Sequence, residues 1–193
     1  MNNIAVTQKP ERADKTRNRA RILEAASAAF AEFGVEAQMD DVAARAGLGV
    51  GTLYRHFATK EALVGAMIRE RFALILDLAR AGLEREGEPF AVVKDVLRGG
   101  AGVCADDVAA QDALMAAGDE AWRRAGDILE ELQATMQVLI DRAQAAGTMR
   151  LDFDSADVSM IMCGVSATMS VDGWDWQRHL EILLDGLAAP GAR

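Results

Sequence analysis

The sequence predicts an all-α protein, and three features of its 193 residues lead to this fold class. First, residues that favour helices are abundant, whereas only 5% of the chain is aromatic. Second, the chain lacks the runs of Val, Ile and Thr with alternating polar residues that mark half-buried strands. Third, its prolines, Pro10, Pro89 and Pro190, fall where helical patterns begin or end. We therefore expect nine helices and no strand.

The N-terminal part of the chain is expected to hold four of these helices. In the first, apolar residues recur at helical spacing on one face, and Gly34 ends the pattern. Gly47 can adopt the positive φ needed where the second helix ends, and Thr59 can cap the start of the fourth. The expected ranges are 14–33, 40–46, 50–57 and 60–85.

Five further helices are expected after Pro89. Gly99, Gly100 and Gly102 weaken the first of them and mark a kink or a close helix contact. Gly147 is expected to stop the longest one. The expected ranges are 90–104, 108–117, 119–146, 154–170 and 174–188.

Charge is distributed unevenly along the chain. The formal net charge of −9 argues against a nucleic-acid partner for the chain as a whole. Residues 1–60, however, carry nine Lys and Arg against seven Asp and Glu, and residues 9–21 carry six against two. A small basic end on an acidic body suits a protein that touches DNA with one face only. Residues 1–13 are mostly polar and are expected to form a flexible basic arm.

The sequence carries no recognisable motif for catalysis, metal binding or membrane insertion. Cys104 and Cys163 form neither a disulfide framework nor a metal motif, and we expect buried, unreactive thiols, with a redox pair as the alternative. No nucleophile-elbow, Walker or zinc motif is present. No apolar stretch approaches 18 residues, and no signal region precedes the first helix. We expect a cytoplasmic protein without enzymatic activity, cofactor, metal or membrane contact.

Residues 40–57 have the pattern of a helix-turn-helix, in which a glycine-containing turn joins two short helices. The apolar residues that can form its core are Val42, Ala43, Leu48, Leu53 and Phe57. The remaining side chains of the second helix suit DNA, because Thr52, Tyr54 and His56 can hydrogen-bond phosphates and Arg55 can reach a phosphate or a guanine edge. The alternative is three packed helices with a solvated polar face.

The predicted DNA-binding surface extends beyond this second helix. Lys60 lies beside free backbone N–H groups at a helix start, where a phosphate is favoured. The predicted DNA-binding residues are Arg17, Arg19, Gln38, Arg45, Gly49, Gly51, Thr52, Tyr54, Arg55, His56 and Lys60.

Several short runs of the sequence match one known pattern. They are Gly34, Asp41-Val42-Ala43, Arg45-Ala46-Gly47, Gly51-Thr52-Leu53-Tyr54, His56-Phe57 and Lys60-Glu61-Ala62-Leu63. Together they resemble the N-terminal domain of the TetR family of bacterial transcriptional regulators, and residues 147–152 resemble the lead into its penultimate helix. The nine expected helices agree with that architecture: a three-helix DNA-binding domain, here residues 14–58, and a helical effector-binding and dimerisation domain, here residues 59–193. The resemblance implies a homodimer on a palindromic DNA operator, usually a repressor that a small molecule releases.

The sequence departs from the family pattern at two places. Family members often carry Thr or Ser where this chain has Gln38, and Ser with Lys or Arg where it has Gly49 and Val50. Gln38 can still donate a hydrogen bond, but Gly49 and Val50 offer only backbone N–H groups. We therefore expect the recognition helix to depend more on backbone amides, Thr52 and Tyr54.

The last two expected helices are candidates for a dimer interface. Apolar residues in the stretch 158–171 occupy more than one face of the expected helix, so it needs burial on two sides. Two such helices per subunit would make an isologous four-helix bundle, and the alternative is an ordinary core within one subunit. The predicted interface residues are Met160, Gly164, Ala167, Trp176, Leu180, Leu183, Leu184 and Leu187.

A cavity for an effector is expected between the fourth and eighth helices. Nine methionines would allow an adaptable apolar site, which suits a hydrophobic or aromatic small molecule, and plain core packing is the alternative. The predicted pocket residues are Phe72, Leu76, Leu97, Cys104, Met115, Trp122, Met136 and Met162, with Leu114 and Leu129 as further candidates.

Other functions fit the same pattern. Within the class, the protein could activate transcription or could act without an effector. Outside the class, it could be an all-α small-molecule-binding protein whose helix-turn-helix no longer binds DNA. The acidic body favours that second alternative, whereas the basic residues of the N-terminal part weigh against it.

Overall fold

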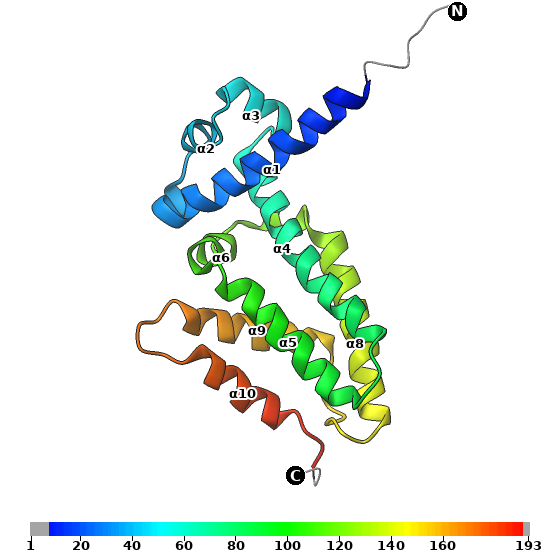
Figure 1. Cartoon of the computed structure of the whole chain (residues 1–193). Helices are drawn as coiled ribbons and strands as arrows, with labels where there is room; N and C mark the ends of the chain where they lie inside the picture. The colour runs from blue at the N-terminus through cyan, green and yellow to red at the C-terminus, as the bar shows by residue number, and fades with distance from the viewer. Residues whose placement is uncertain (1–7, 191–193) are drawn as a thin grey trace, which may run out of the picture.

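The computed structural model in Figure 1 describes residues 8–190 of the chain. Within this range the fold is all-α, as predicted, with ten α-helices and no strand, and one isolated antiparallel bridge joins Met149 to Ala188. The helices are α1 (Gln8–Phe33), α2 (Met39–Arg45), α3 (Val50–His56), α4 (Lys60–Leu83), α5 (Pro89–Ala105), α6 (Val108–Met115), α7 (Asp119–Arg123), α8 (Gly126–Ala145), α9 (Ser155–Met169) and α10 (Trp176–Gly186), with a 3-10 turn η1 (Gly34–Glu36) after α1.

The first helix begins earlier than predicted. The sequence pattern predicts a start at Asp14, but α1 begins at Gln8, so residues 8–13 of the expected arm are helical. Pro10 falls in the first turn, where a missing N–H group costs no helical hydrogen bond, so it does not prevent the earlier start. Residues 1–7 of the predicted arm lie outside the described residues.

The long helix predicted over residues 119–146 is two helices, which accounts for ten helices instead of nine. Helix α7 ends at Arg123, and Ala125 leaves the helical conformation with φ of −105° and ψ of 4° before α8 starts at Gly126. Glycine has a low helix propensity, and Ala125 is completely buried. Both helices pack against α4, and α8 runs along it (Figure 1).

Helix α4 connects two apolar cores. Its first half, from Leu63 to Ile68, is buried with α1, α2 and α3 in one cluster, which also includes residues of α6 and α7. Ala79, in the second half, belongs to a cluster with α5, α8, α9 and α10. At Gly65 the backbones come so close that a Cβ atom would lie 3.0 Å from the carbonyl oxygen of Ala121 in α7. The first core thus continues past residue 58 into the larger part of the chain.

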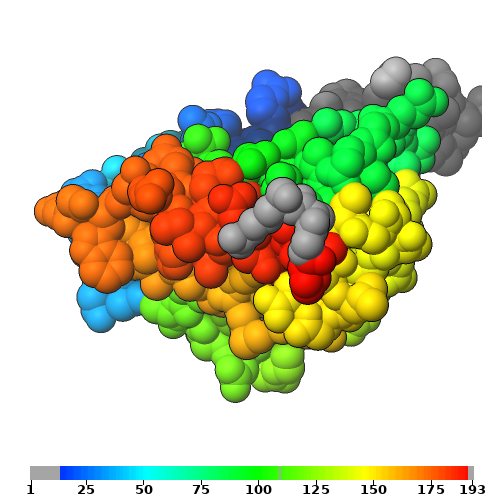
Figure 2. Space-filling view, turned by 90° about the horizontal axis from the view of Figure 1, so that it is seen from below, coloured from blue at the N-terminus to red at the C-terminus, as the bar shows by residue number. Residues whose placement is uncertain are grey.

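Helices α9 and α10 form one face of the molecule. They pack against each other and α9 also packs on α5 and α8. In the view from below they occupy the centre of the surface, coloured orange to red (Figure 2). The helix-turn-helix lies at the opposite end of the molecule, so this face points away from α2 and α3 (Figure 1).

Candidate nucleic-acid interface and ligand cavity

The second helix of the helix-turn-helix, α3, is fixed by a small apolar core and by α1. Leu53 and Phe57, on its inner side, are buried. Gly47 has a φ of +62°, as predicted, which lets the chain turn after α2. Arg21 of α1 donates a hydrogen bond from Nη2 to the carbonyl oxygen of Ala46 at 2.5 Å, and this bond satisfies a carbonyl at the end of α2. The orientation of α3 is therefore set from the α1 side.

The outer face of α3 is open. A Cβ atom added at Gly49 or at Gly51 would meet no heavy atom of the described chain within 4 Å. Tyr54 is 47% exposed, and Arg55 donates a hydrogen bond from Nη2 to Thr52 Oγ1 at 2.9 Å. Gly49 is the N-cap of α3, a position that accepts glycine, whereas packing within the described chain gives no reason for glycine at position 51. The open surface suits the close approach of another molecule's backbone.

Three basic side chains surround His56 at the end of α3. Burial lowers the pKa of His56 most, and the charges of Lys15, Arg19 and Arg55 lower it further. The Arg19 guanidinium also lies over the ring of Phe57, 4.9 Å from the ring centroid. The effect of these cations on His56 indicates a locally positive potential on a chain whose net charge is −9. This surface can attract phosphates.

Two predicted DNA-binding side chains donate hydrogen bonds to backbone carbonyl groups of their own chain. Gln38 donates from Nε2 to the carbonyl oxygen of Glu36 at 2.6 Å. Lys60 donates from Nζ to the carbonyl oxygen of Val35 at 2.5 Å. Each of them retains further donor hydrogens.

Two predicted arginines form ion pairs. Arg45 pairs with Glu32, and its guanidinium lies 5.4 Å from the ring centroid of Phe33. Arg17 pairs with Asp14 at 2.6 Å, and both side chains are largely exposed. The structure therefore brings together the α3 residues and Arg19, whereas Arg45 is turned toward α1.

Two basic residues of α1 at this surface were not among the predicted DNA-binding residues. Lys15 precedes Arg19 by four residues and so shares its helix face, a spacing that could have revealed it. Arg21 supports the end of α2 through a backbone carbonyl, and no sequence pattern indicates that contact.

A cavity of about 390 Å³ lies between α4, α5, α6, α8 and α9, next to both cores. This volume falls within the usual range for small-molecule sites. Of the eight residues predicted to line such a pocket, seven do, and so does Leu129. The lining residues are Phe72, Ile75, Val96, Leu97, Gly100, Cys104, Gln111, Met115, Trp122, Leu129, Leu132, Gln133, Met136, Ser155, Val158, Ser159, Met162, Cys163 and Ser166.

Two residues expected at the cavity lie elsewhere. Leu76 and Leu114 are buried, but neither lines the cavity. Ile75 and Leu76 follow Phe72 by three and four positions and so lie near the same face, and the rotation of α4 places Ile75, not Leu76, in the cavity wall. The prediction of Leu76 as a pocket residue is therefore wrong by one helical position.

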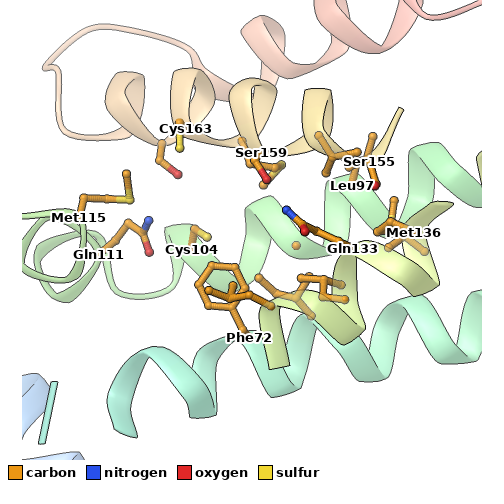
Figure 3. Close-up of a pocket in the computed structure, with 18 of the residues that line it drawn as sticks. Phe72, Leu97, Cys104, Gln111, Met115, Gln133, Met136, Ser155, Ser159 and Cys163 are labelled. Atoms are coloured by element: carbon orange, nitrogen blue, oxygen red, sulfur yellow. The ribbon is translucent and has the colours of Figure 1, made fainter. Parts of the chain in front are cut away.

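The cavity wall is apolar with a few polar side chains, and it contains no charged residue. Phe72 and Trp122 meet edge to face, with ring centroids 6.0 Å apart. Figure 3 shows Phe72 on α4 at one side, Ser159 on α9 at the other, and Gln111 on α6 at one end. The polar lining residues were missed from the sequence, because a single Gln or Ser on a helix has no periodic signature. They are Gln111, Gln133, Ser155, Ser159 and Ser166.

The two cysteines both line the cavity but differ in exposure. Cys104 is buried, and burial raises the pKa of its thiol, so it stays protonated at neutral pH. Cys163 is exposed, so the expectation that both thiols are buried is wrong for Cys163. It lines the cavity and is also accessible from outside the protein.

A chain of hydrogen bonds connects the cavity wall with α1. Gln111 accepts a hydrogen bond through Oε1 from Arg71 Nη1 at 2.6 Å. Arg71 also donates from Nη2 to the carbonyl oxygen of Asp107 at 3.4 Å. The Asp107 carboxylate caps α6 at the Ala110 N–H, 3.0 Å away, and accepts a hydrogen bond from Ser27 of α1. Helix α6 is thus held at one end to the N-terminal domain while its middle faces the cavity.

Comparison with known proteins gives the family. Residues 22–67 match the bacterial regulatory proteins of the tetR family, and residues 88–189 match the C-terminal domain of SbtR-like transcriptional regulators. The TetR transcription regulatory protein from Mycobacterium vanbaalenii is 37% identical, and the match covers 93% of this chain and 100% of that one with a TM-score of 0.64. The chain belongs to the TetR family.

Further solved structures agree with this assignment. A TetR transcriptional regulator from Streptomyces coelicolor is 32% identical over 90% of this chain and 99% of that one, with a TM-score of 0.62. FadR from Bacillus subtilis, solved in complex with stearoyl-CoA, is 18% identical over 87% and 98% with a TM-score of 0.71, a likeness of fold alone. No curated protein matches the sequence. This TetR-family chain is thus a transcriptional regulator with a DNA-binding helix-turn-helix and a C-terminal ligand-binding domain.

The outward face of α9 in this TetR-family chain carries small and apolar residues. Met160 is 69% exposed, and Gly164 and Ala167 are exposed as well. On α10, Ile182 is 58% exposed. Because positions 156, 160, 163, 164 and 167 are exposed and share one side of the helix, they form a stripe without a charged side chain, which we call the α9 stripe.

The predicted interface residues of α10 need correction. Leu180, Leu184 and Leu187 are buried in the second core of their own subunit, so they cannot form a surface for a partner. Trp176 and Leu183 are half-buried and pack against the same core. The amphipathic stripe of α10 was identified correctly as buried, but it packs against its own chain.

In the described part of the chain, no three His, Cys, Asp or Glu side chains gather closely enough to hold a metal ion. None of the described helices is long and apolar enough to cross a membrane.

Proposed function

We propose that the protein is a homodimeric repressor that binds a palindromic DNA operator through α3 and is released when a small molecule occupies the cavity. The observation that carries this proposal is the position of the cavity between the two cores. Its walls include α4 and α6, which also hold the N-terminal domain through the first core and through Ser27. A ligand there would contact both helices that connect the two parts of the protein.

The proposed DNA contacts begin on α3. Its open glycines let the backbone N–H groups approach a phosphate, and Thr52, Tyr54 and Arg55 lie on or beside the same exposed face. Lys15 and Arg19 of α1 extend the positive surface. We assign Arg17, Gln38, Arg45, His56 and Lys60 to the edge of the contact, since each of them is paired within the chain or half-buried.

The α9 stripe is the proposed centre of the dimer interface. Small residues at Gly164 and Ala167 allow a second helix to approach closely, and Met160 supplies apolar area. An isologous pair would place two recognition helices on two half-sites, which in helix-turn-helix dimers lie about 34 Å apart. Substituting Leu180, Leu184 or Leu187 would act on the fold of the subunit before any effect on the dimer.

The hydrogen-bonded path through α6 is the proposed link between ligand and operator. A ligand that bonds to Gln111 would pull on its bond with Arg71, and α6 would then shift at Asp107, which holds Ser27. Such a shift would change the separation of the two α3 helices and so favour a state that does not fit the operator. Bacillus subtilis FadR has this fold and was solved with stearoyl-CoA, which supports a ligand role for the C-terminal part.

The DNA-binding proposal is tested with double-stranded DNA that flanks the protein's own gene. Fluorescence anisotropy should give tight binding whose logarithmic salt slope falls by about one in Arg55→Ala. Arg123→Ala is the matched control, because its side chain is 73% exposed on α7, far along the chain from α3. Binding that is unaffected by Arg55→Ala would remove α3 from the contact, and no binding at all would favour a small-molecule-binding protein without DNA function.

The dimer proposal is tested by sedimentation. Met160→Lys should give a folded monomer with weaker operator binding, because a charge would be buried in the interface. Leu74→Lys is the control, since Leu74 is 57% exposed on α4 and lies outside the α9 stripe. A Met160→Lys protein that stays dimeric would place the interface elsewhere. Deletion of the gene should raise transcription from the operator, and a fall would indicate an activator.

A further inference from the structure

The orientation of the Gln111 side chain is determined by Arg71. Gln111 is 7% exposed and lies in the cavity wall. Arg71 approaches it from behind and donates a hydrogen bond to Oε1 at 2.6 Å. A guanidinium group has donors and no acceptor, so the amide cannot be reversed without placing its NH₂ group against another donor. Its Nε2 must therefore face away from Arg71, toward the cavity (Figure 3).

The Nε2 group of Gln111 is a donor in the cavity wall that is available to a ligand. No acceptor for it is found among residues 14–190, whereas Oε1 is bonded. Among the described residues, no side-chain N or O atom is both fully buried and without a partner, so Nε2 is open to the cavity, where an acceptor on a ligand can bond it in mainly apolar surroundings.

The remainder of the wall disfavours a charged ligand. None of the residues that line the cavity carries a charge, and Cys104 is a neutral thiol because burial raises its pKa. Arg71 is not part of the lining and is engaged by Gln111 and by the carbonyl oxygen of Asp107. A carboxylate or phosphate inside would lose its hydration without gaining an ionic partner.

The opposite side of the cavity selects an apolar body. Phe72 and Trp122 present aromatic surface, and Met136 and Met162 can adapt to an irregular shape. We propose that the cavity takes an uncharged, mainly apolar molecule with a carbonyl or ether oxygen, which accepts a hydrogen bond from Gln111 Nε2. This inference rests on the proposed function of the cavity as an effector site and adds the chemical class of the effector and the residue that selects it.

The test uses three naphthalenes of nearly equal shape: 2-acetylnaphthalene, 2-ethylnaphthalene and 2-naphthoate. Displacement of Nile red from the full-length protein measures the Kd of each. The acetyl compound should bind about fivefold to tenfold more tightly than the ethyl compound, because only its carbonyl accepts the hydrogen bond. The naphthoate should bind at least about tenfold more weakly than the acetyl compound, since its charge must be desolvated.

Two variants identify the selecting residue. Gln111→Glu keeps an acceptor for Arg71 but removes the donor, so the ratio of the ethyl Kd to the acetyl Kd should fall to about one. Binding of the ethyl compound should persist, which shows that the cavity is intact. Gln133→Met removes the other amide of the wall, which is exposed on α8, and should leave the preference unchanged. Thermal unfolding followed by circular dichroism establishes that both variants fold.

Each outcome decides the inference. The inference is overturned if the acetyl and ethyl compounds bind equally, or if naphthoate binds most tightly. It is also overturned if the preference disappears in Gln133→Met instead, or if none of the compounds binds. The proposed function fails in a different way: the selective binding is present, but the protein loaded with 2-acetylnaphthalene holds the operator as tightly as the free protein. That result would leave Gln111 as the selecting residue of a site that does not control DNA binding.

Discussion

Gly51 offers a substitution whose effects on stability and on DNA binding should have opposite signs. In the free protein an alanine Cβ at this position meets nothing within 4 Å among the described residues. The substitution therefore adds no clash, and because Gly51 does not have a positive φ, alanine should stabilise the protein by about 0.4–1 kcal/mol, mainly by restricting the unfolded chain. For a chain of this size, a gain of about 1 kcal/mol raises Tm by roughly 2–4 °C.

The same methyl group should weaken operator binding. If the open surface at the first turn of α3 exists to let a phosphate approach the backbone, a Cβ atom there holds the phosphate away. Loss of one hydrogen bond to a charged group costs about 1.5–3 kcal/mol, which is roughly a tenfold to 150-fold rise in Kd. Unfolding by heat and anisotropy with labelled operator measure the two effects on one preparation.

Gly102→Ala in α5 is the matched control. A Cβ atom at Gly102 also meets nothing within 4 Å of the described chain, and α5 lies in the ligand-binding part, away from α3. It should raise Tm by a similar amount and leave the operator Kd unchanged. The reasoning fails if Gly51→Ala binds the operator as tightly as the unaltered protein, or if both variants weaken binding equally.

Three further predictions concern packing, protonation and an ion pair. Gly65→Ala should lower the free energy of unfolding by about 1–3 kcal/mol, because the methyl group would lie 3.0 Å from the carbonyl oxygen of Ala121. A denaturant titration measures this loss, and a stabilised variant would contradict the close contact. Because the pKa of His56 is lowered in the free protein, folding stability should fall as the pH drops below 6.5. Operator affinity should rise over the same pH range, about tenfold for each pH unit by which a bound phosphate raises the pKa of His56. An operator affinity that is independent of pH would exclude His56 from the contact. Glu181→Gln should cost about 0.5–1 kcal/mol at pH 7, because Arg98 donates to both Glu181 carboxylate oxygens at 2.7 Å. Since Arg98 holds the pKa of Glu181 below its usual value, this difference should shrink as the pH falls below 4.5, and a difference that persists at low pH would have another cause.

The helix-turn-helix could be predicted from the sequence because its signals are local. Gly47 ends α2 with a positive φ, and Thr59 caps α4 by accepting a hydrogen bond from the Ala62 N–H at 3.2 Å. Both features depend on residues within a few positions of each other, so the sequence alone indicates them. The break before α8 is also local, but Gly126 lies in a long segment with helical spacing of its apolar residues, so the sequence pattern gives no sign of the break.

The ligand-binding part could be predicted less completely, because periodicity indicates that a face is buried without indicating what covers it. Leu180 and Leu184 share an apolar stripe that would suit a partner helix as well as the core of the same subunit, and the structure places them in the core. The cavity depends on helix rotation, so Ile75 and Leu76 were indistinguishable from the sequence. Gln111 has no periodic signature at all, and its role becomes visible only when Arg71 is found behind it.

The separation of the helix-turn-helix from the body of the molecule has a consequence for how the protein meets DNA. Residues 1–60 carry a formal charge of +2 and residues 61–193 a charge of −11, and α2 and α3 lie at the end of the molecule opposite α10 (Figure 1). Such a chain is an electric dipole, and the field of a nucleic acid exerts a torque on it before contact. The acidic end is turned away from the DNA, so most encounters involve the α3 surface and few involve the acidic part of the molecule. We expect this alignment to fade as salt shortens the Debye length to about 8 Å at physiological ionic strength, so that the protein turns toward DNA only at close range.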